Sequence, residues 1–303
     1  MIRVSEEVEL CVDDLGDERD PLVLLVMGLG LQLVWWRDDF CRALVDRGFR
    51  VVRYDHRDVG RSTPFSGPGV GALGFLTRRA RTVYELEDLA DDAGRLIELL
   101  APEHGAHVVG VSMGSFVAQA TAIRHPDSVR SLVSIMGRPG DGRTGKVAWR
   151  ARPEFLRQGP ADPDGAIEHL VKSFRRIGSE GRTEEDDEDV RVAMGRSFGR
   201  ERGDGTGAGR QLAAILSERD RTPGLNGLEM PALVVHGLRD RIVLPSGGRA
   251  TAAAILGAEL LEIPGMGHDL ARWTWPQVLD GIARTAARAG AYDGLEPVRG
   301  SSR

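Results

Sequence analysis

The stretch that decides the fold reads His107-Val108-Val109-Gly110-Val111-Ser112-Met113-Gly114. Its first three residues are mostly apolar and β-favouring, which is typical of a short buried strand. Beyond Ser112 the apolar residues recur at three- and four-residue spacing, which indicates a helix. The pattern therefore places a serine at an abrupt strand-to-helix turn, and glycines flank it because the backbone is crowded there.

This placement makes Ser112 a candidate nucleophile. The turn lifts its hydroxyl above the edge of the sheet and aims the free N–H groups of the new helix at the atom that the serine attacks. The pattern Gly-x-Ser-x-Gly also occurs by chance in glycine-rich turns, so the prediction depends on finding a base and an acid elsewhere in the chain.

Composition limits the class of protein. The 303 residues suffice for one large α/β domain with an insertion or for two modest domains, and the apolar share of 41% is ordinary for a globular protein. The net charge of −5 argues against a nucleic-acid partner, which would require a basic face. Cys11 and Cys41 lack the spacing of metal ligands, so we expect two free packing residues.

The N-terminus gives an expectation about location. Acidic residues stand in Met1–Glu7 where a signal peptide would need an apolar core, and no apolar run is as long as a membrane span. We therefore expect a soluble, cytoplasmic protein that does not bind membranes. Its oligomeric state, monomer or homodimer, stays open.

Strands and helices alternate on both sides of the serine. Strand-like runs fall at residues 22–26, 49–54, 129–136, 232–236 and 259–263, and helix-like runs at 40–47, 83–100, 247–256 and 277–288. This alternation predicts an α/β fold with a mostly parallel sheet and helices on both faces. Residues 8–12 suit an outer strand, and 13–20 a turn.

Residues 137–230 interrupt this alternation with helices and no convincing strand. We expect a helical cap inserted into a core formed by 1–136 and 231–290, with a loose tail over 291–303. The acidic run 184–189 suggests a metal site or, preferably, the solvated start of a helix. Four cap aromatics suit either an apolar substrate pocket or the cap's own core: Trp149, Phe155, Phe174 and Phe198.

A serine nucleophile needs a histidine base that is oriented by an acid. Asp240 follows the strand-like run 232–236, and His268 follows the next run, so both are expected at the carboxyl edge of the sheet beside Ser112. Asp141 is the competing acid and His56 the rival base, although Asp55 and Arg57 around His56 are expected to brace one another.

An oxyanion hole requires backbone N–H groups aimed at the developing negative charge. One is expected from Met113, directly after the serine. The second is expected from the loop after residues 22–26, most simply from Leu29, because Gly28 before it permits a close approach.

These stretches together resemble the α/β-hydrolase superfamily from about Val8 to Arg288. Met27 stands where the superfamily often has histidine before the loop glycine, and the turn Arg57-Asp58-Val59-Gly60-Arg61-Ser62 follows the next strand. This combination is similar to the bacterial esterase branch that includes aclacinomycin methylesterase. The resemblance implies hydrolysis of a small-molecule ester through an acyl-enzyme, with no metal or organic cofactor.

The substrate does not follow from the resemblance, because one fold hosts many chemistries. Lactonase, thioesterase, perhydrolase and carbon–carbon bond hydrolase activities use the same triad and stay open, as does a ligand sensor with little turnover. Haloalkane dehalogenases and epoxide hydrolases use an aspartate nucleophile, so Ser112 argues against both.

Overall fold

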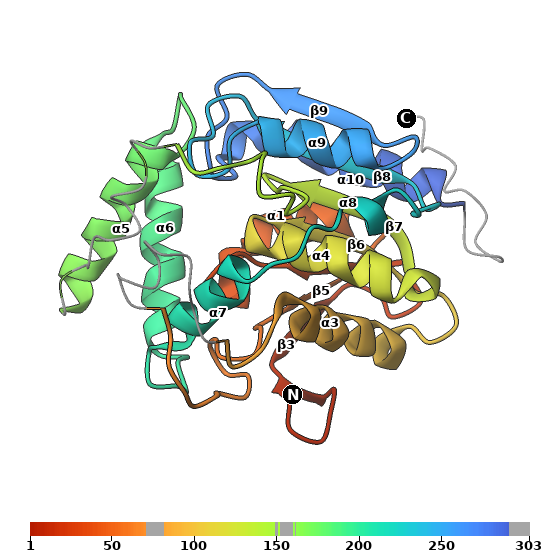
Figure 1. Cartoon of the computed structure of the whole chain (residues 1–303). Helices are drawn as coiled ribbons and strands as arrows, with labels where there is room; N and C mark the ends of the chain where they lie inside the picture. The colour runs from red at the N-terminus through yellow and green to blue at the C-terminus, as the bar shows by residue number, and fades with distance from the viewer. Residues whose placement is uncertain (71–81, 149–150, 152–159, 161, 291–303) are drawn as a thin grey trace.

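The computed structural model describes residues 1–70, 82–148, 151, 160 and 162–290. Its centre is a seven-stranded sheet in the order β3-β5-β4-β6-β7-β8-β9 (Figure 1). The strands are β3 (Val12–Leu15), β4 (Leu22–Val26), β5 (Arg50–Tyr54), β6 (Ala106–Val111), β7 (Val129–Ile135), β8 (Ala232–Gly237) and β9 (Glu259–Ile263). Only β3 pairs antiparallel with its neighbour, so this sheet is mostly parallel, as predicted.

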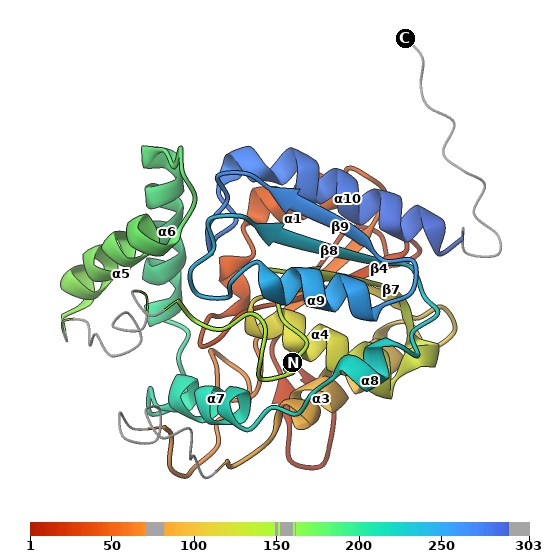
Figure 2. The same ribbon diagram turned by 45° about the horizontal axis from the view of Figure 1, so that its top comes forward.

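Both faces of the sheet are covered by helices. One apolar core packs α3 (Leu86–Leu100), α4 (Met113–Arg124) and α9 (Ser246–Ala254) against one face, and a second packs α1 (Asp38–Val45) and α10 (Trp275–Arg288) against the other. Every residue of β4, β6 and β8 is buried, which explains why these strands are largely apolar. Figure 2 shows the two helical layers on either side of the sheet.

Between β7 and β8 the chain forms α5 (Pro163–Ile177), α6 (Glu184–Phe198), α7 (Gly207–Leu216) and the short α8 (Thr222–Leu225). The helices α5 and α6 pack side by side at one end of the molecule (Figures 1 and 2). The acidic run begins α6, where Thr183 and Asp186 form a reciprocal capping pair. Within the part of the chain that is described, no group of side chains is suited to a metal ion.

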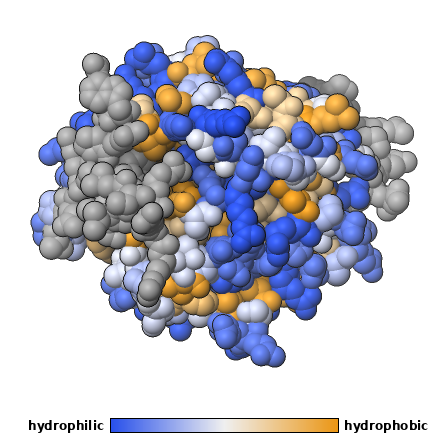
Figure 3. Space-filling model, viewed as in Figure 1, coloured by the Kyte–Doolittle hydropathy of each residue, from blue (hydrophilic) through white to orange (hydrophobic). Residues whose placement is uncertain are grey.

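The remaining elements are short. A separate two-stranded ribbon joins β1 (Ile2–Arg3) to β2 (Glu9–Leu10). Single turns of 3-10 helix among the described residues are η1 (Leu33–Trp35), η2 (Pro126–Ser128) and η4 (Arg272–Thr274). None of the described helices is long and apolar enough to cross a membrane. On the face shown in Figure 3, hydrophilic residues predominate between small separate groups of hydrophobic ones.

The predicted turn over residues 13–20 is wrong in its first part, because β3 occupies Val12–Leu15. Asp13 and Asp14 are strand residues whose carboxylates pair with Arg53 and Arg50 of the neighbouring β5. Acidic residues are rare in strands, so the sequence pattern pointed to a turn. The two cysteines are free, as predicted, and burial raises the pKa of the Cys41 thiol to about 12.

Candidate active site

Ser112 lies in a strained turn between β6 and α4. Its φ of 54° and ψ of −121° place it in a region that L-residues rarely adopt. A Cβ atom on Gly110 would lie 2.1 Å from the Gly114 carbonyl oxygen, and a Cβ on Gly114 would lie 2.1 Å from that of Val26. Both positions therefore require glycine, and the surrounding backbone holds Ser112 in its unusual conformation.

Three predicted residues meet at the carboxyl edge of the sheet. The Ser112 Oγ lies 2.9 Å from His268 Nε2, and His268 Nδ1 lies 2.7 Å from Asp240 Oδ2. Ser112 follows β6, Asp240 follows β8 and His268 follows β9, so three parallel strands deliver the three side chains to one place. The arrangement can pass a proton from the hydroxyl to an imidazole whose other nitrogen faces a carboxylate.

The Asp240 carboxylate is buried but fully supplied with hydrogen bonds. Its Oδ1 accepts the backbone N–H groups of Ile242 and Val243 at 2.8 and 2.9 Å, while Oδ2 faces His268. Burial opposes ionisation, but the charge of His268 and hydrogen bonds from His236 and His268 outweigh it and lower the pKa of Asp240 to about 2. The group is therefore an anion at neutral pH, ready to stabilise a positive imidazolium.

The competing acid has a local role. Asp141 accepts hydrogen bonds from the backbone N–H groups of Arg143 and Thr144 and from the Thr144 hydroxyl, so its carboxylate closes its own turn.

The rival base, His56, is buried and contacts the backbone of Met27. His56 is 1% exposed, its Nε2 lies 3.0 Å from the Met27 carbonyl oxygen, and burial lowers its pKa to about 4. The expected brace between Asp55 and Arg57 is wrong: Asp55 pairs with Arg200, and Arg57 pairs with Asp92. Neighbouring residues in a turn point apart here, and each finds a partner on a distant element.

The loop after β4 passes close to the serine. A Cβ atom on Gly28 would lie 3.4 Å from the Ser112 Cβ, so this backbone lies directly beside the hydroxyl. Among the described residues, neither the Leu29 nor the Met113 N–H group donates to a protein acceptor. Both are therefore available to a bound group, as an oxyanion hole requires.

Sequence reasoning missed a support for that loop. The side-chain carbonyl oxygen of Gln211, in α7, accepts the Gly30 N–H at 2.8 Å, and its amide donates to the Arg57 carbonyl oxygen at 3.2 Å. Gln211 is completely buried. No local pattern in the sequence pointed to this role, because the burial of Gln211 results from tertiary contacts.

The four cap aromatics are placed differently from one another. Phe174 stacks on Trp35 with ring centroids 5.6 Å apart and lines a cavity of about 90 Å³ that Trp36 and Trp275 also border. Phe198 ends α6 and is 44% exposed. Trp149 and Phe155 lie outside the described residues.

Comparison with known proteins identifies the family to which this fold belongs. The family described as "alpha/beta hydrolase fold" matches residues 21–271. Rhodomycin D methylesterase DauP of Streptomyces sp. (strain C5) is 28% identical over 290 residues, covering 88% of this chain and 91% of that protein. Rhodomycin D methylesterase DnrP of Streptomyces peucetius is 29% identical over 294 residues, with the same two coverages.

Solved structures agree on the fold. The crystal structure of the putative non-heme bromoperoxidase BpoC from Mycobacterium tuberculosis H37Rv matches with a TM-score of 0.67 and 22% identity, covering 93% of this chain and 97% of that one. The fold and the resemblance to bacterial methylesterases that the sequence predicted are confirmed.

Proposed function

Since this chain belongs to the alpha/beta hydrolase fold family, we propose that it is a serine hydrolase that cleaves carboxylic esters through an acyl-enzyme. The observation that carries the proposal is the continuous line of contacts from Ser112 Oγ through His268 to Asp240. We assign Ser112 as the nucleophile, His268 as the general base and Asp240 as the acid that orients it.

In the first half of the reaction, His268 Nε2 takes the Ser112 proton while Oγ attacks the ester carbonyl carbon. Asp240 holds the imidazole in the tautomer whose Nε2 is free and stabilises the imidazolium that forms. The Leu29 and Met113 N–H groups donate to the tetrahedral oxyanion. The imidazolium then gives its proton to the alcohol oxygen, the carbon–oxygen bond breaks, and the acyl group stays on Ser112.

In the second half, water replaces the alcohol. His268 takes a proton from the water as it attacks the acyl carbon, and the same N–H groups stabilise the second oxyanion. The Ser112 oxygen leaves with the proton from His268, which restores the free enzyme and releases the acid. All protons move among the serine, the histidine, the substrate and water, so the reaction as written uses no cofactor.

The substrate class we propose is a small or medium-sized, partly apolar ester, and a methyl ester is the first to test. The support is that two relatives covering 88% of the chain are named methylesterases. We further propose that residues 137–230 form a cap over the core made by 1–136 and 231–290. The protein is proposed to act in the cytoplasm as a monomer or a homodimer.

The test has two parts. A fluorophosphonate probe should label the protein, and mass spectrometry should place the adduct on the peptide containing Ser112. A series of p-nitrophenyl acyl esters and methyl esters should then show saturable hydrolysis. An adduct on another serine would overturn the assignment, and tight ligand binding without turnover would instead identify a sensor.

A further inference from the structure

The turn between α5 and α6 lies against residues 265–269, which carry His268 and are called the histidine loop below. The Glu180 N–H donates to the Gly265 carbonyl oxygen at 2.7 Å, and the His268 N–H donates to the Ile177 carbonyl oxygen at 2.9 Å. A Cβ atom on Gly267 would lie 2.2 Å from the backbone of Gly178, so the two chains touch with no side chain between them. A segment about 90 residues earlier in the chain thus holds the backbone of His268 itself.

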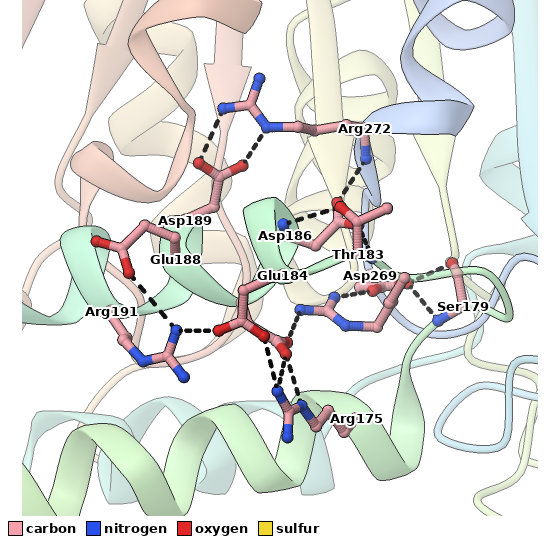
Figure 4. Close-up of polar contacts among 12 residues, drawn as sticks. Arg175, Ser179, Thr183, Glu184, Asp186, Glu188, Asp189, Arg191, Asp269 and Arg272 are labelled. Atoms are coloured by element: carbon pink, nitrogen blue, oxygen red, sulfur yellow. Dashed lines mark hydrogen bonds and ion pairs between the residues drawn. The ribbon is translucent and has the colours of Figure 1, made fainter.

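Ser179 joins this turn to both neighbours of the histidine. Its Oγ accepts the Gly267 N–H at 3.0 Å. The same Oγ donates to Asp269 Oδ1, and the Ser179 backbone N–H donates to that oxygen at 2.8 Å (Figure 4). Ser179 and Asp269 are only 7% and 6% exposed. One hydroxyl therefore connects the residue before His268 with the residue after it.

Arg182 completes the arrangement by balancing the buried charge. Its guanidinium pairs with Asp269 Oδ2 on one side and with Asp187 Oδ1, at 2.9 Å, on the other. A buried carboxylate without a partner would be costly, so the pair fixes where the Asp269 side chain can lie. Figure 4 shows Ser179 joined to Asp269, and Asp186 and Asp189 of α6 joined to Arg272.

We propose that Ser179, Asp269 and Arg182 are positioning residues, which hold His268 in line between Ser112 and Asp240. The inference rests on the proposed function and deepens it: the α5–α6 turn supplies part of the support for the base. A general base must stay within hydrogen-bond reach of its proton, and a displacement of about 1 Å can cost roughly 100-fold in rate.

A purely structural role makes a different prediction. If the contacts only attached α5 and α6 to the core, breaking them would lower the melting temperature, and the rate of the folded enzyme would be unchanged. A positioning role lowers kcat of the folded enzyme while KM changes little, because the lost alignment affects the proton transfer more than the binding of the ester.

Ser197 provides a matched control. It has the same 7% exposure as Ser179, lies in α6, and its hydroxyl also links this region to the core, through Trp35 Nε1 at 3.2 Å. It makes no contact with the histidine loop among the described residues. Ser179→Ala and Ser197→Ala therefore remove comparable hydroxyls, but only the first touches the neighbours of His268.

The experiment measures kcat and KM on one p-nitrophenyl ester, the fluorophosphonate labelling rate at Ser112, and the melting temperature. We expect Ser179→Ala to lower kcat and the labelling rate by about 10- to 100-fold with KM within about threefold. Ser179→Thr, which keeps the hydroxyl, should recover most of the loss, and Ser197→Ala should keep the wild-type rates. Asp269→Asn serves as the second variant if Ser179→Ala does not fold.

The outcomes distinguish a failure of the positioning role from a failure of the proposed function. Wild-type rates in folded Ser179→Ala or Asp269→Asn, or an equal loss of rate in Ser197→Ala, would overturn the positioning role while leaving the proposed function intact. A wild-type protein that neither reacts with the fluorophosphonate at Ser112 nor hydrolyses any ester would overturn the proposed function, and the positioning role with it.

Discussion

At the scale of the residue, two substitutions at Ser112 distinguish the role of its hydroxyl from the strain of its backbone. Ser112→Ala should lower turnover by about 10⁴-fold or more, because it removes the attacking oxygen. Ser112→Gly should be equally inactive but more stable than Ser112→Ala by about 1 kcal/mol, since glycine adopts a φ of 54° without steric cost. Urea unfolding of the two variants measures the difference, and an alanine variant that is the more stable would show that the turn is not strained.

Asp240 and Asp141 give a paired prediction about the acid. Asp240→Asn should lower kcat by about 10⁴-fold, because an amide neither favours the working tautomer of His268 nor stabilises its positive charge. Asp141→Asn should leave kcat unchanged within about twofold, since that carboxylate only closes the turn to Thr144. Steady-state kinetics on one ester decides between them, and the opposite pattern would make Asp141 the acid.

How far the sequence predicted this site depends on where each residue lies relative to a strand. Ser112 and Asp240 follow buried strands, and His268 follows the outer strand β9. A parallel sheet brings the residues after its strands together at one edge, so the meeting of the three was predictable. Ser179 and Gln211 lie among helices, whose docking is set by tertiary contacts that no local pattern encodes. The predicted pair of Asp55 with Arg57 was wrong for the same reason: each residue pairs with a partner on a distant element.

At the scale of the element, α7 supports the loop that carries Leu29. We expect Gln211→Leu to lower kcat by about tenfold, because the Gly30 N–H loses its acceptor and the neighbouring peptide groups lose their fixed orientation. Gln119→Leu is the control: Gln119 is equally buried, but its amide contacts Ser134 and Arg221, away from that loop. Kinetics and melting temperatures of both variants test this, and equal effects on kcat would contradict it.

The elements themselves were largely predictable, with errors at their ends and at one edge. The run Leu22–Val26 coincides with β4 because it is buried on both faces and contains no polar residue. The helix expected from residue 83 begins at Leu86, since Glu85 and Asp88 form a capping box that fixes its start. An outer strand was expected at residues 8–12, but β3 occupies Val12–Leu15. Its acidic residues form salt bridges with β5, which leave no local pattern in the sequence.

At the scale of the whole molecule, two buried histidines make the free energy of unfolding depend on pH. Burial lowers the pKa of both His56 and His107 from 6.5 to about 4. Between those two values the unfolded chain binds up to two more protons than the folded protein, so the free energy of unfolding falls as the pH falls. Each histidine contributes at most about 1.4 kcal/mol per pH unit in this window.

His107→Asn tests this account, because asparagine can still pair with Ser131 but does not take up a proton. Urea unfolding at pH 7, 6 and 5 should show a pH dependence smaller than that of the wild type by up to about one proton, with the largest difference near pH 5. An unchanged slope would mean that folding does not lower the pKa of His107.

The contact between Gly178 and Gly267 has a consequence for protein engineering. Because the two backbones touch, residues 177–180 and 265–269 must match each other in shape and in hydrogen bonding. A chimera could take its α5–α6 region from a relative in order to change the substrate range. Its α5–α6 turn and its histidine loop would then come from different proteins, and their shapes would not match. Such grafts should recover their rate when the donor's own histidine loop is transplanted along with the donor's helices.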